Sequence, residues 1–482
     1  MNLKLIISKY DRLSVAAKAS LWFIFCYVIQ RGLQLIGLPI FTRVMSTEEY
    51  GTYSVFLSWF NLLCVFTSLN IYSGAFNKAM VKFSQSKDCY ISSIQWMTLF
   101  LSFIFSIIVI CFNDFFSELT GYSLKFQLLM CLHLLLFPSL QYWSQKQRFL
   151  FEYKKLVIVT LVNSFSSLFF GVIFVFLSED KSFALISVTV FVQAIINFVL
   201  FFSNVEKNSS IFNKQYWSWS LIIALPLIPH YLSEILLGHA DRIMISQICG
   251  SSQAGIYNLV YQLSMVMTVI RSGINGAFVP WLYNSLNSKD YKKIKDVSNI
   301  ITFVMFFFTF IFMLIGPELL MLVAPPSYSS AKMGIPAIMI GCFFIYVYVL
   351  FMYVEIFFEK TRGVAIASII AAVINILLNS IFIEKYGYLS AAYTTMFSYM
   401  LMSFIHFIFL KKILSNNSEV KIMYDIRLLV VMSIILLIIG GLSVYLYRIT
   451  LLRWMIIIIL GIIALKYKER IMSIYILLRK NN

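Results

Sequence analysis

The sequence predicts an all-α polytopic membrane protein with about 14 transmembrane helices and an internally duplicated architecture. Of its 482 residues, 60% are hydrophobic and only 12% are charged, whereas about 25% of the residues in soluble domains are charged. Fourteen apolar stretches are long enough to cross about 30 Å of hydrocarbon as helices. Their centres lie at Val28, Trp59, Ile104, Leu134, Phe165, Gln193, Pro229, Gln262, Phe308, Phe344, Val373, Phe397, Leu436 and Ile457.

The first and seventh spans carry recognisable boundary signals. A basic amino-terminal segment leads into an apolar run that continues to Ile40 without a small-residue cleavage site, which predicts an uncleaved first span. Pro39 in span 1, and Pro226 and Pro229 in span 7, can break the two helices that begin the two halves. Spans 13 and 14 are separated only by a short linker around residues 448–453.

A repeat divides the chain into two halves. Two triplets, Gly-Ala-Phe and Ser-Lys-Asp, occur from Gly74 and Ser86 and again 202 residues later, from Gly276 and Ser288. A Gly-x-Tyr motif precedes each copy, at 51–53 and at 255–257. Duplicated membrane bundles are typical of carriers that alternate access around a central site.

The repeat predicts three regions of the chain. Spans 1–6 form an N-lobe over residues 1–202, and spans 7–12 form a C-lobe over residues 203–412. Residues 413–482 hold spans 13 and 14 and a cytoplasmic tail.

Charge placement predicts the orientation. With the amino terminus in the cytoplasm, 28 of the 38 basic residues fall in inward segments, so both termini are predicted to be cytoplasmic. The formal net charge of +17 is therefore mostly a topology signal, with attraction to anionic membrane lipid as a secondary effect. Nucleic-acid binding is not predicted, since no basic stretch belongs to a soluble module.

The sequence gives no sign of an enzyme. Seven cysteines and four histidines show no ligand spacing, so no metal and no cofactor are predicted. A P-loop is absent, and the loops between spans are too short for a catalytic domain that would activate a sugar acceptor.

Two arginines within spans are the main candidates for a binding site. Arg31 lies near the middle of span 1 and Arg271 in span 8, where a lone guanidinium costs about 2.5–3.5 kcal/mol. Gln30 and Gln34 flank Arg31, and Asn275 lies one turn after Arg271. One hypothesis is that these groups face a wet cavity and grip an anionic group, because a guanidinium matches phosphate bidentately. The alternative is that each arginine bonds a neighbouring helix or a buried acid.

The acids and amides within spans complete the candidate set. Glu234 and Glu355 are the candidates for H+ or Na+ coupling, and an interfacial position beside Glu359 and Lys360 is the alternative for Glu355. Asn163 in span 5 and Asn375, with Asn379, in span 11 occupy corresponding places in the two halves. They either form interhelical hydrogen bonds or line a sugar path.

Three segments of the chain resemble a known family. Residues 38–43 followed by 46–53 resemble the opening of polysaccharide-unit flippases of the multidrug/oligosaccharidyl-lipid/polysaccharide exporter superfamily. Residues 241–245 followed by 254–257 resemble the second-half signature of that family. Residues 375–379, 386–387 and 391–392 resemble its passage from span 11 to span 12.

The resemblance implies two six-helix lobes in a V around a central cavity, with spans 13 and 14 peripheral. It also implies that an undecaprenyl-diphosphate-linked oligosaccharide moves from the inner to the outer leaflet of a bacterial inner membrane, with Arg31 and Arg271 as the expected basic cavity residues. We predict a monomeric flippase for an O-antigen unit of lipopolysaccharide, driven by H+ or Na+, with a glycan polymerase as a partner.

Two other functions remain as alternatives. A multidrug/cation antiporter of the same superfamily would carry an acid in span 1, and none lies between Lys18 and Arg43. A membrane glycan polymerase would need a large outward loop. The single Arg31 argues against a flippase for the lipid-linked peptidoglycan precursor, because such flippases usually have more arginines in their first two spans.

Overall fold

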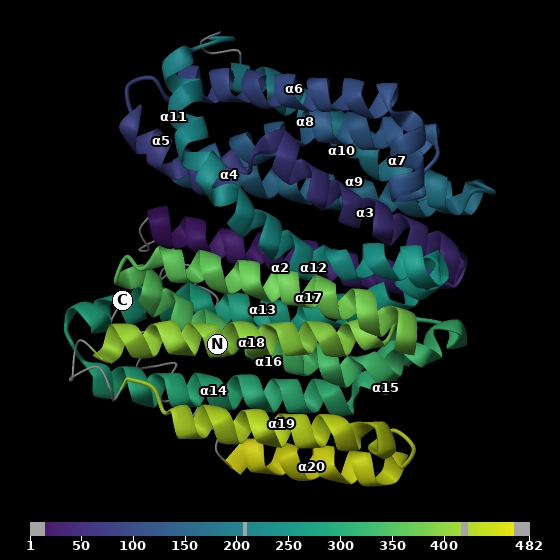
Figure 1. The fold of residues 1–482 in the computed structure, drawn as a ribbon, viewed down its shortest axis with the longest axis vertical. Coiled ribbons are helices and arrows are strands. Elements are labelled where there is room, and N and C mark those ends of the chain that lie inside the picture. Colours follow the sequence, from purple (N-terminus) through teal and green to yellow (C-terminus); the bar gives the residue numbers. More distant parts are fainter. Residues whose placement is uncertain (1–14, 206–209, 416–422, 467–482) are drawn as a thin grey trace, which may run out of the picture. The chain divides into compact units, whose positions relative to one another are not determined.

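The computed structural model describes residues 15–205, 210–415 and 423–466, and every regular element in these ranges is a helix (Figure 1). The elements of the first part of the chain are α2 (Val15–Val44), α3 (Thr47–Ser68), α4 (Ile71–Gly74), α5 (Phe76–Lys82), α6 (Lys87–Cys111), α7 (Asn113–Thr120), α8 (Leu124–Phe149), α9 (Tyr153–Leu177), α10 (Lys181–Val205), α11 (Lys214–Ala224), η1 (Leu225–Leu227) and α12 (Ile228–Cys249). Those of the second part are α13 (Ser251–Asn287), α14 (Tyr291–Leu314), α15 (Gly316–Val323), η2 (Pro326–Gly334), α16 (Ile335–Phe357), α17 (Thr361–Tyr386), α18 (Ser390–Ser415), α19 (Ile426–Leu446) and α20 (Thr450–Lys466).

The all-helical membrane fold predicted from the sequence is confirmed. Each of the fourteen predicted span centres lies inside a separate helix. Eleven helical segments among the described residues are long and apolar enough to cross a membrane. Helices α3 and α13 are not in that set, and α20 contributes only a shorter apolar stretch, Thr450–Ile459. The count of fourteen spans therefore stays a prediction.

Proline acts differently in the two helices where a break was expected. Pro226 lies in η1, a 3-10 turn that joins α11 to α12. In α2 the helix continues through Pro39. Side chains of the next turn donate to carbonyls beside this proline, Thr42 Oγ1 to Leu38 O at 2.9 Å and the Arg43 guanidinium to Pro39 O at 3.0 Å. The expected break is thus present in span 7 and absent in span 1.

The helices group into two compact units, residues 1–255 and 256–482. In the first unit α10 is central, since it packs against α3, α6, α8 and α9, while α2 packs along α9 and α12 crosses α3. In this grouping α11 and α12 pack with the first unit, although the sequence repeat assigned them to the second lobe. The predicted lobe boundary between residues 202 and 203 rests on the sequence repeat. Grouping by contacts does not test that repeat, so the boundary stays a prediction.

Helix α16 is the centre of the second unit. It packs against α14, α17, α18 and α19. Helices α19 and α20 lie at the edge of this unit, where both pack against α14 (Figure 1). This placement agrees with the peripheral role predicted for spans 13 and 14.

Helices α2 and α9 run side by side in the same direction. Near their amino-terminal ends the rings of Trp22 and Tyr153 stack, with centroids 6.3 Å apart. Fifteen residues further along each helix, a Cβ built on Gly37 would lie 2.9 Å from Leu168 Cδ1. In both pairs the residue of α9 is numbered 131 higher than the residue of α2 (153 − 22 and 168 − 37). Because both helices rise by about 1.5 Å per residue, any two residues with this difference in number lie at the same level.

The repeated Gly-x-Tyr motif makes a close helix crossing. A capping box starts α3, in which Ser46 Oγ accepts from Glu49 N at 3.1 Å and Glu49 Oε2 accepts from Ser46 N at 2.7 Å. One turn later, a Cβ on Gly51 would lie 1.7 Å from Ser251 O, and a Cβ on Gly255 would lie 2.3 Å from a backbone oxygen of α3. The first glycine of each motif copy therefore permits direct backbone contact.

The same turn ends α8 and α16. Phe151 and Glu359 have left-handed φ values of 56° and 58°. In each turn an amide reaches back five residues: Glu152 N donates to Gln147 O at 2.9 Å, and Lys360 N donates to Glu355 O at 2.8 Å. Gln147 and Glu355 therefore occupy equivalent positions in the two turns.

Candidate functional site

Arg31 lies on a polar face of α2. Its guanidinium donates to Gln34 Oε1 at 2.9 Å, and its Cζ lies 5.3 Å from the ring centroid of Tyr27. Arg31 and Gln30 are half-buried and Gln34 is exposed. Gln34 lies one turn after both Gln30 and Arg31, so the three residues form a donor-rich strip in the middle of an apolar helix.

Asn163 lies beside this strip. The common offset of the parallel helices α2 and α9 places Asn163 within one residue of the level of Arg31. Asn163 is half-buried, and its Oδ1 atom is buried with no hydrogen-bond partner among the described residues. The sequence grouped Asn163 with Asn375 and Asn379 of span 11, and the structure places it on α9, a neighbour of α2, at the same level as Arg31.

Arg271 is half-buried on α13, with the half-buried Asn275 one turn later on the same face. Among the described residues, its guanidinium has no hydrogen bond and no ion pair. Its charge acts on Cys342 and Tyr353, which places it near α16. Arg271 therefore retains its full set of donors for a ligand.

Glu234 lies on an exposed face of α12. Its Oε1 atom is 3.8 Å from His230 Nε2, one turn earlier, and its side chain is 49% exposed. A Cβ on Gly238, one turn later on that face, would meet nothing within 4 Å. Because an exposed carboxylate within a span is strongly disfavoured in hydrocarbon, this face of α12 is expected to line water.

Glu355 is buried near the end of α16. Its Oε1 atom lies 2.7 Å from Nδ1 of His406 on α18, and both side chains are 0% exposed. Glu359 and Lys360, just beyond the end of α16, are exposed, and the interfacial alternative for Glu355 stays a prediction. The acid is part of a buried carboxylate–imidazole pair between two helices.

Asn375 takes part in a buried hydrogen-bond chain between α17 and α18. It donates through Nδ2 to Thr395 Oγ1 at 3.2 Å and accepts from Asn379 Nδ2 at 3.3 Å, while Thr394 Oγ1 donates to Asn379 Oδ1. Both asparagines are 0% exposed. In this structure Asn375 makes the interhelical contacts that were one of its two predicted roles.

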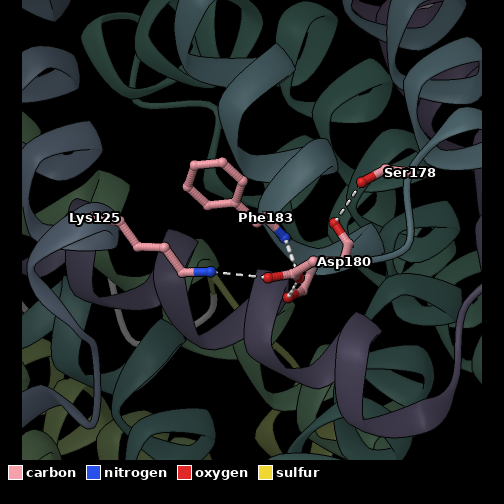
Figure 2. Close-up of polar contacts among 5 residues, drawn as sticks. Lys125, Ser178, Asp180 and Phe183 are labelled. Carbon is pink, nitrogen blue, oxygen red and sulfur yellow. Dashed lines mark hydrogen bonds and ion pairs between the residues drawn. The ribbon is translucent and has the colours of Figure 1, made fainter.

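A polar cluster outside the spans fixes the start of α10 (Figure 2). Asp180 accepts from the Phe183 amide at 3.0 Å through Oδ1, and its Oδ2 lies 2.9 Å from Lys125 Nζ. Partial burial acts to raise the pKa of Asp180, but the Phe183 amide and the Lys125 ammonium outweigh it and lower this pKa. The cluster is a helix cap with an ion pair, and it holds no predicted site residue.

His406 is a candidate site residue that the sequence did not predict. His406 and Glu355 are 51 residues apart, so no local spacing joins them. The available signal was topological, because both residues lie toward the carboxyl-terminal ends of two even-numbered spans, which run in the same direction.

Comparison with known proteins supports the predicted class. The family model described as polysaccharide biosynthesis protein matches residues 16–286. An uncharacterized membrane protein of Methanocaldococcus jannaschii is 21% identical over 448 residues, which cover 83% of this chain and 85% of that protein.

Solved structures share the fold. A lipid II flippase MurJ in an inward closed conformation has a TM-score of 0.67 and 16% identity, and the match covers 93% of this chain and 99% of that chain. An inward-facing multidrug resistance MATE family transporter of the MOP superfamily has a TM-score of 0.61 and 11% identity, with 81% and 96% covered. At these identities the likeness shows the fold alone.

Proposed function

Because this chain belongs to the polysaccharide biosynthesis protein family, we propose that it is a flippase for an undecaprenyl-diphosphate-linked oligosaccharide. It moves the unit, an O-antigen repeat, from the inner to the outer leaflet of a bacterial inner membrane by alternating access. Both termini are cytoplasmic, the protein acts as a monomer, and a glycan polymerase uses the product. The solved structures with this fold are a flippase and multidrug transporters, which supports transport over catalysis.

The observation that best supports this proposal is the environment of the Arg271 guanidinium. A half-buried guanidinium without a hydrogen bond or ion pair among the described residues is costly within a membrane helix. A diphosphate would satisfy it with charge-assisted, bidentate hydrogen bonds. Asn275 on the same face can donate to the same group or to an attached sugar.

Arg31 supplies a second anion contact in the first unit. Gln34 and Tyr27 hold its guanidinium on one face of α2. Gln30 and the unpartnered Oδ1 of Asn163, at the same depth, offer hydrogen bonds to sugar hydroxyls. In this proposal the arginines bind the diphosphate and the amides contact the glycan.

Coupling to an ion gradient needs a titratable group that can meet water. Glu234 is exposed beside the open surface at Gly238, so it can exchange H+ or Na+. Glu355 is buried with His406, so it can exchange an ion only when the helices around it move.

Complementation of a strain that lacks the gene tests the anion site. Arg271→Ala and Arg31→Ala should each abolish surface glycan and leave its lipid-linked precursor in the inner leaflet, at normal protein levels. Arg271→Lys should restore only part of the glycan, since lysine keeps the charge but loses the planar fork. The matched control is Arg427→Ala, which removes an exposed arginine from the start of the edge helix α19.

Full glycan in the Arg31→Ala/Arg271→Ala double variant would reject the anion site. Normal glycan in the deletion strain, combined with increased sensitivity to cationic drugs, would instead identify a multidrug antiporter.

A further inference from the structure

Glu355 and His406 form a buried ionisable pair whose second polar atoms are unused. Glu355 Oε1 and His406 Nδ1 are 2.7 Å apart, and neither side chain is exposed. Glu355 Oε2 and His406 Nε2 are both buried without a hydrogen-bond partner among the described residues. Buried polar atoms are normally satisfied, so two orphans in one pair point to a ligand or a proton that occupies the site in part of a cycle.

The surroundings of the pair are close-packed. Glu355 Oε2 faces the first turn of α17, where a Cβ on Gly363 would lie 3.0 Å from this oxygen and 3.2 Å from the Phe409 ring. The His406 ring stacks on Tyr348, with centroids 5.5 Å apart. Glycine at position 363 therefore lets the start of α17 approach the carboxyl group, and the positive end of the helix dipole favours a negative charge there.

Other charged groups on the neighbouring elements do not neutralise the pair. Lys295 of α14 and Asp425 before α19 pair with each other at 3.5 Å. Arg271 of α13 acts on Tyr353, two residues before Glu355. Of the other described charged residues near these helix ends, Lys293 of α14 is half-buried, and the following are exposed: Glu359, Lys360 and Arg362 around the start of α17, Lys411 and Lys412 in α18, and Arg427 in α19.

Proton counting defines the state of this pair. With one proton it is neutral overall, either as carboxylate and imidazolium or as carboxylic acid and imidazole. With no proton it carries one negative charge, and with two it carries one positive charge. Burying an uncompensated charge is strongly unfavourable, so the closed arrangement of α16 and α18 favours the single-proton state.

We propose that Glu355 and His406 bind one H+ as a unit, and that this pair is the proton site that drives the transport cycle. The inference rests on the proposed flippase function and commits it to H+ rather than Na+. The proton enters at Glu355 Oε2 or His406 Nε2 when α16, α17 and α18 separate enough to admit water from one side of the membrane, and it is released when the pair is opened to water on the other side. One carboxylate oxygen beside a basic nitrogen can hold a proton, but it does not form the oxygen cage that an alkali cation needs.

The first half of the chain lacks this chemistry at the equivalent turn. Gln147 occupies the position of Glu355, and its side chain cannot titrate. The proton site thus belongs to the second repeat alone.

Infrared titration of the full chain in liposomes tests the proton site without any substrate. The wild-type protein should show a pH-dependent carboxyl band, either the carbonyl stretch of the acid or the stretch of the carboxylate, and Glu355→Gln should remove it. His406→Gln should change the pH dependence of this band, because coupled sites titrate together. The control His133→Gln changes the buried histidine that pairs with Gln193 in the first unit, and it should leave this band unchanged.

A band that survives Glu355→Gln, or a pH dependence that does not change in His406→Gln, would overturn the proposal. Surface glycan in the complemented strain at acidic and alkaline external pH gives the transport readout. Normal glycan from Glu355→Gln at every pH would overturn the coupling role. Failure of the wild-type gene to restore glycan would reject the flippase function itself, while the infrared result would still decide whether the pair binds a proton.

Discussion

The two copies of the repeat are alike in one region and differ in another. They are alike at the Gly51–Gly255 crossing, and they differ toward the carboxyl-terminal ends of the paired helices α8 and α10, and α16 and α18. At the crossing both copies of Gly-x-Tyr keep their glycine, and each glycine meets the backbone of the other segment. At the helix ends the two copies have diverged. In the first unit Asn204 donates to Gln95 Oε1 at 2.7 Å and to Ser139 O at 3.1 Å, and these groups are all neutral. In the second unit the corresponding helices carry the Glu355–His406 pair.

This contrast separates geometry from chemistry. The glycines persist in both copies where only hydrogen fits, because a larger side chain would strike a backbone atom that cannot rotate away. Polar groups between helices are free to differ as long as each copy satisfies its own hydrogen bonds. A titrating pair is therefore expected in one repeat, with no counterpart in the other.

The largest effect is expected at the crossing. Gly51→Ala places Cβ 1.7 Å from Ser251 O and Gly255→Ala places it 2.3 Å from Thr47 O, so both should prevent stable folding. The cost should exceed the usual ~1–3 kcal/mol of overpacking, since the atoms that must move are backbone atoms. Gly238→Ala is the control, because nothing lies within 4 Å of its Cβ. Size-exclusion profiles in detergent would report the folded fraction, and a folded Gly51→Ala protein would contradict the contact.

Much of this geometry could be predicted from the sequence, and the part that could not depends on helix rotation. Apolar length was sufficient to place every span centre within a helix, and the motif repeat identified Gly51 and Gly255 as equivalent. The burial of Glu355 was not predictable, because the residue lies two positions before the end of α16 and could face solvent or a neighbour. Only the packing of α18 and the approach of Gly363 decide this.

A second prediction compares the two diverged helix ends. His406→Leu leaves the Glu355 carboxyl buried without its partner and should lower stability by about 3 kcal/mol. Asn204→Leu leaves neutral acceptors unpaired and should cost about 1–2 kcal/mol. Unfolding midpoints in detergent, followed by tryptophan fluorescence, would measure both.

The double variant Glu355→Leu/His406→Leu sharpens this comparison. Replacing a whole buried pair with apolar residues is often neutral or stabilising, so the double variant should recover most of the stability lost in His406→Leu. It should still fail to produce surface glycan if the pair carries the coupling proton. Stability that falls further in the double variant would show that the two residues act independently.

The smallest loss of stability is expected from the contacts that hold the amino-terminal ends of α10 and α18. The first uses the Lys125–Asp180 ion pair at 2.9 Å, and the second uses a hydrogen bond between Tyr388 Oη and Ser330 Oγ at 2.8 Å. Asp180→Asn keeps the helix cap, since asparagine caps as well as aspartate, and removes only the charge. The ion pair is about half exposed, so the loss should be about 0.2–1 kcal/mol at neutral pH and smaller in high salt.

The pH dependence of Asp180→Asn identifies its cause. The folded protein lowers the pKa of Asp180 below its ordinary value of 3.8, so this carboxylate stabilises the fold at pH values above 3.8. That contribution is lost as the pH falls through the lowered folded pKa, where wild-type and Asp180→Asn should reach equal stability. Ser330→Ala, which removes the corresponding neutral hydrogen bond in the second unit, should instead give a stability difference that does not change with pH. Parallel pH profiles for the two variants would show that the Asp180 charge contributes nothing and that both starts are held by hydrogen bonds alone.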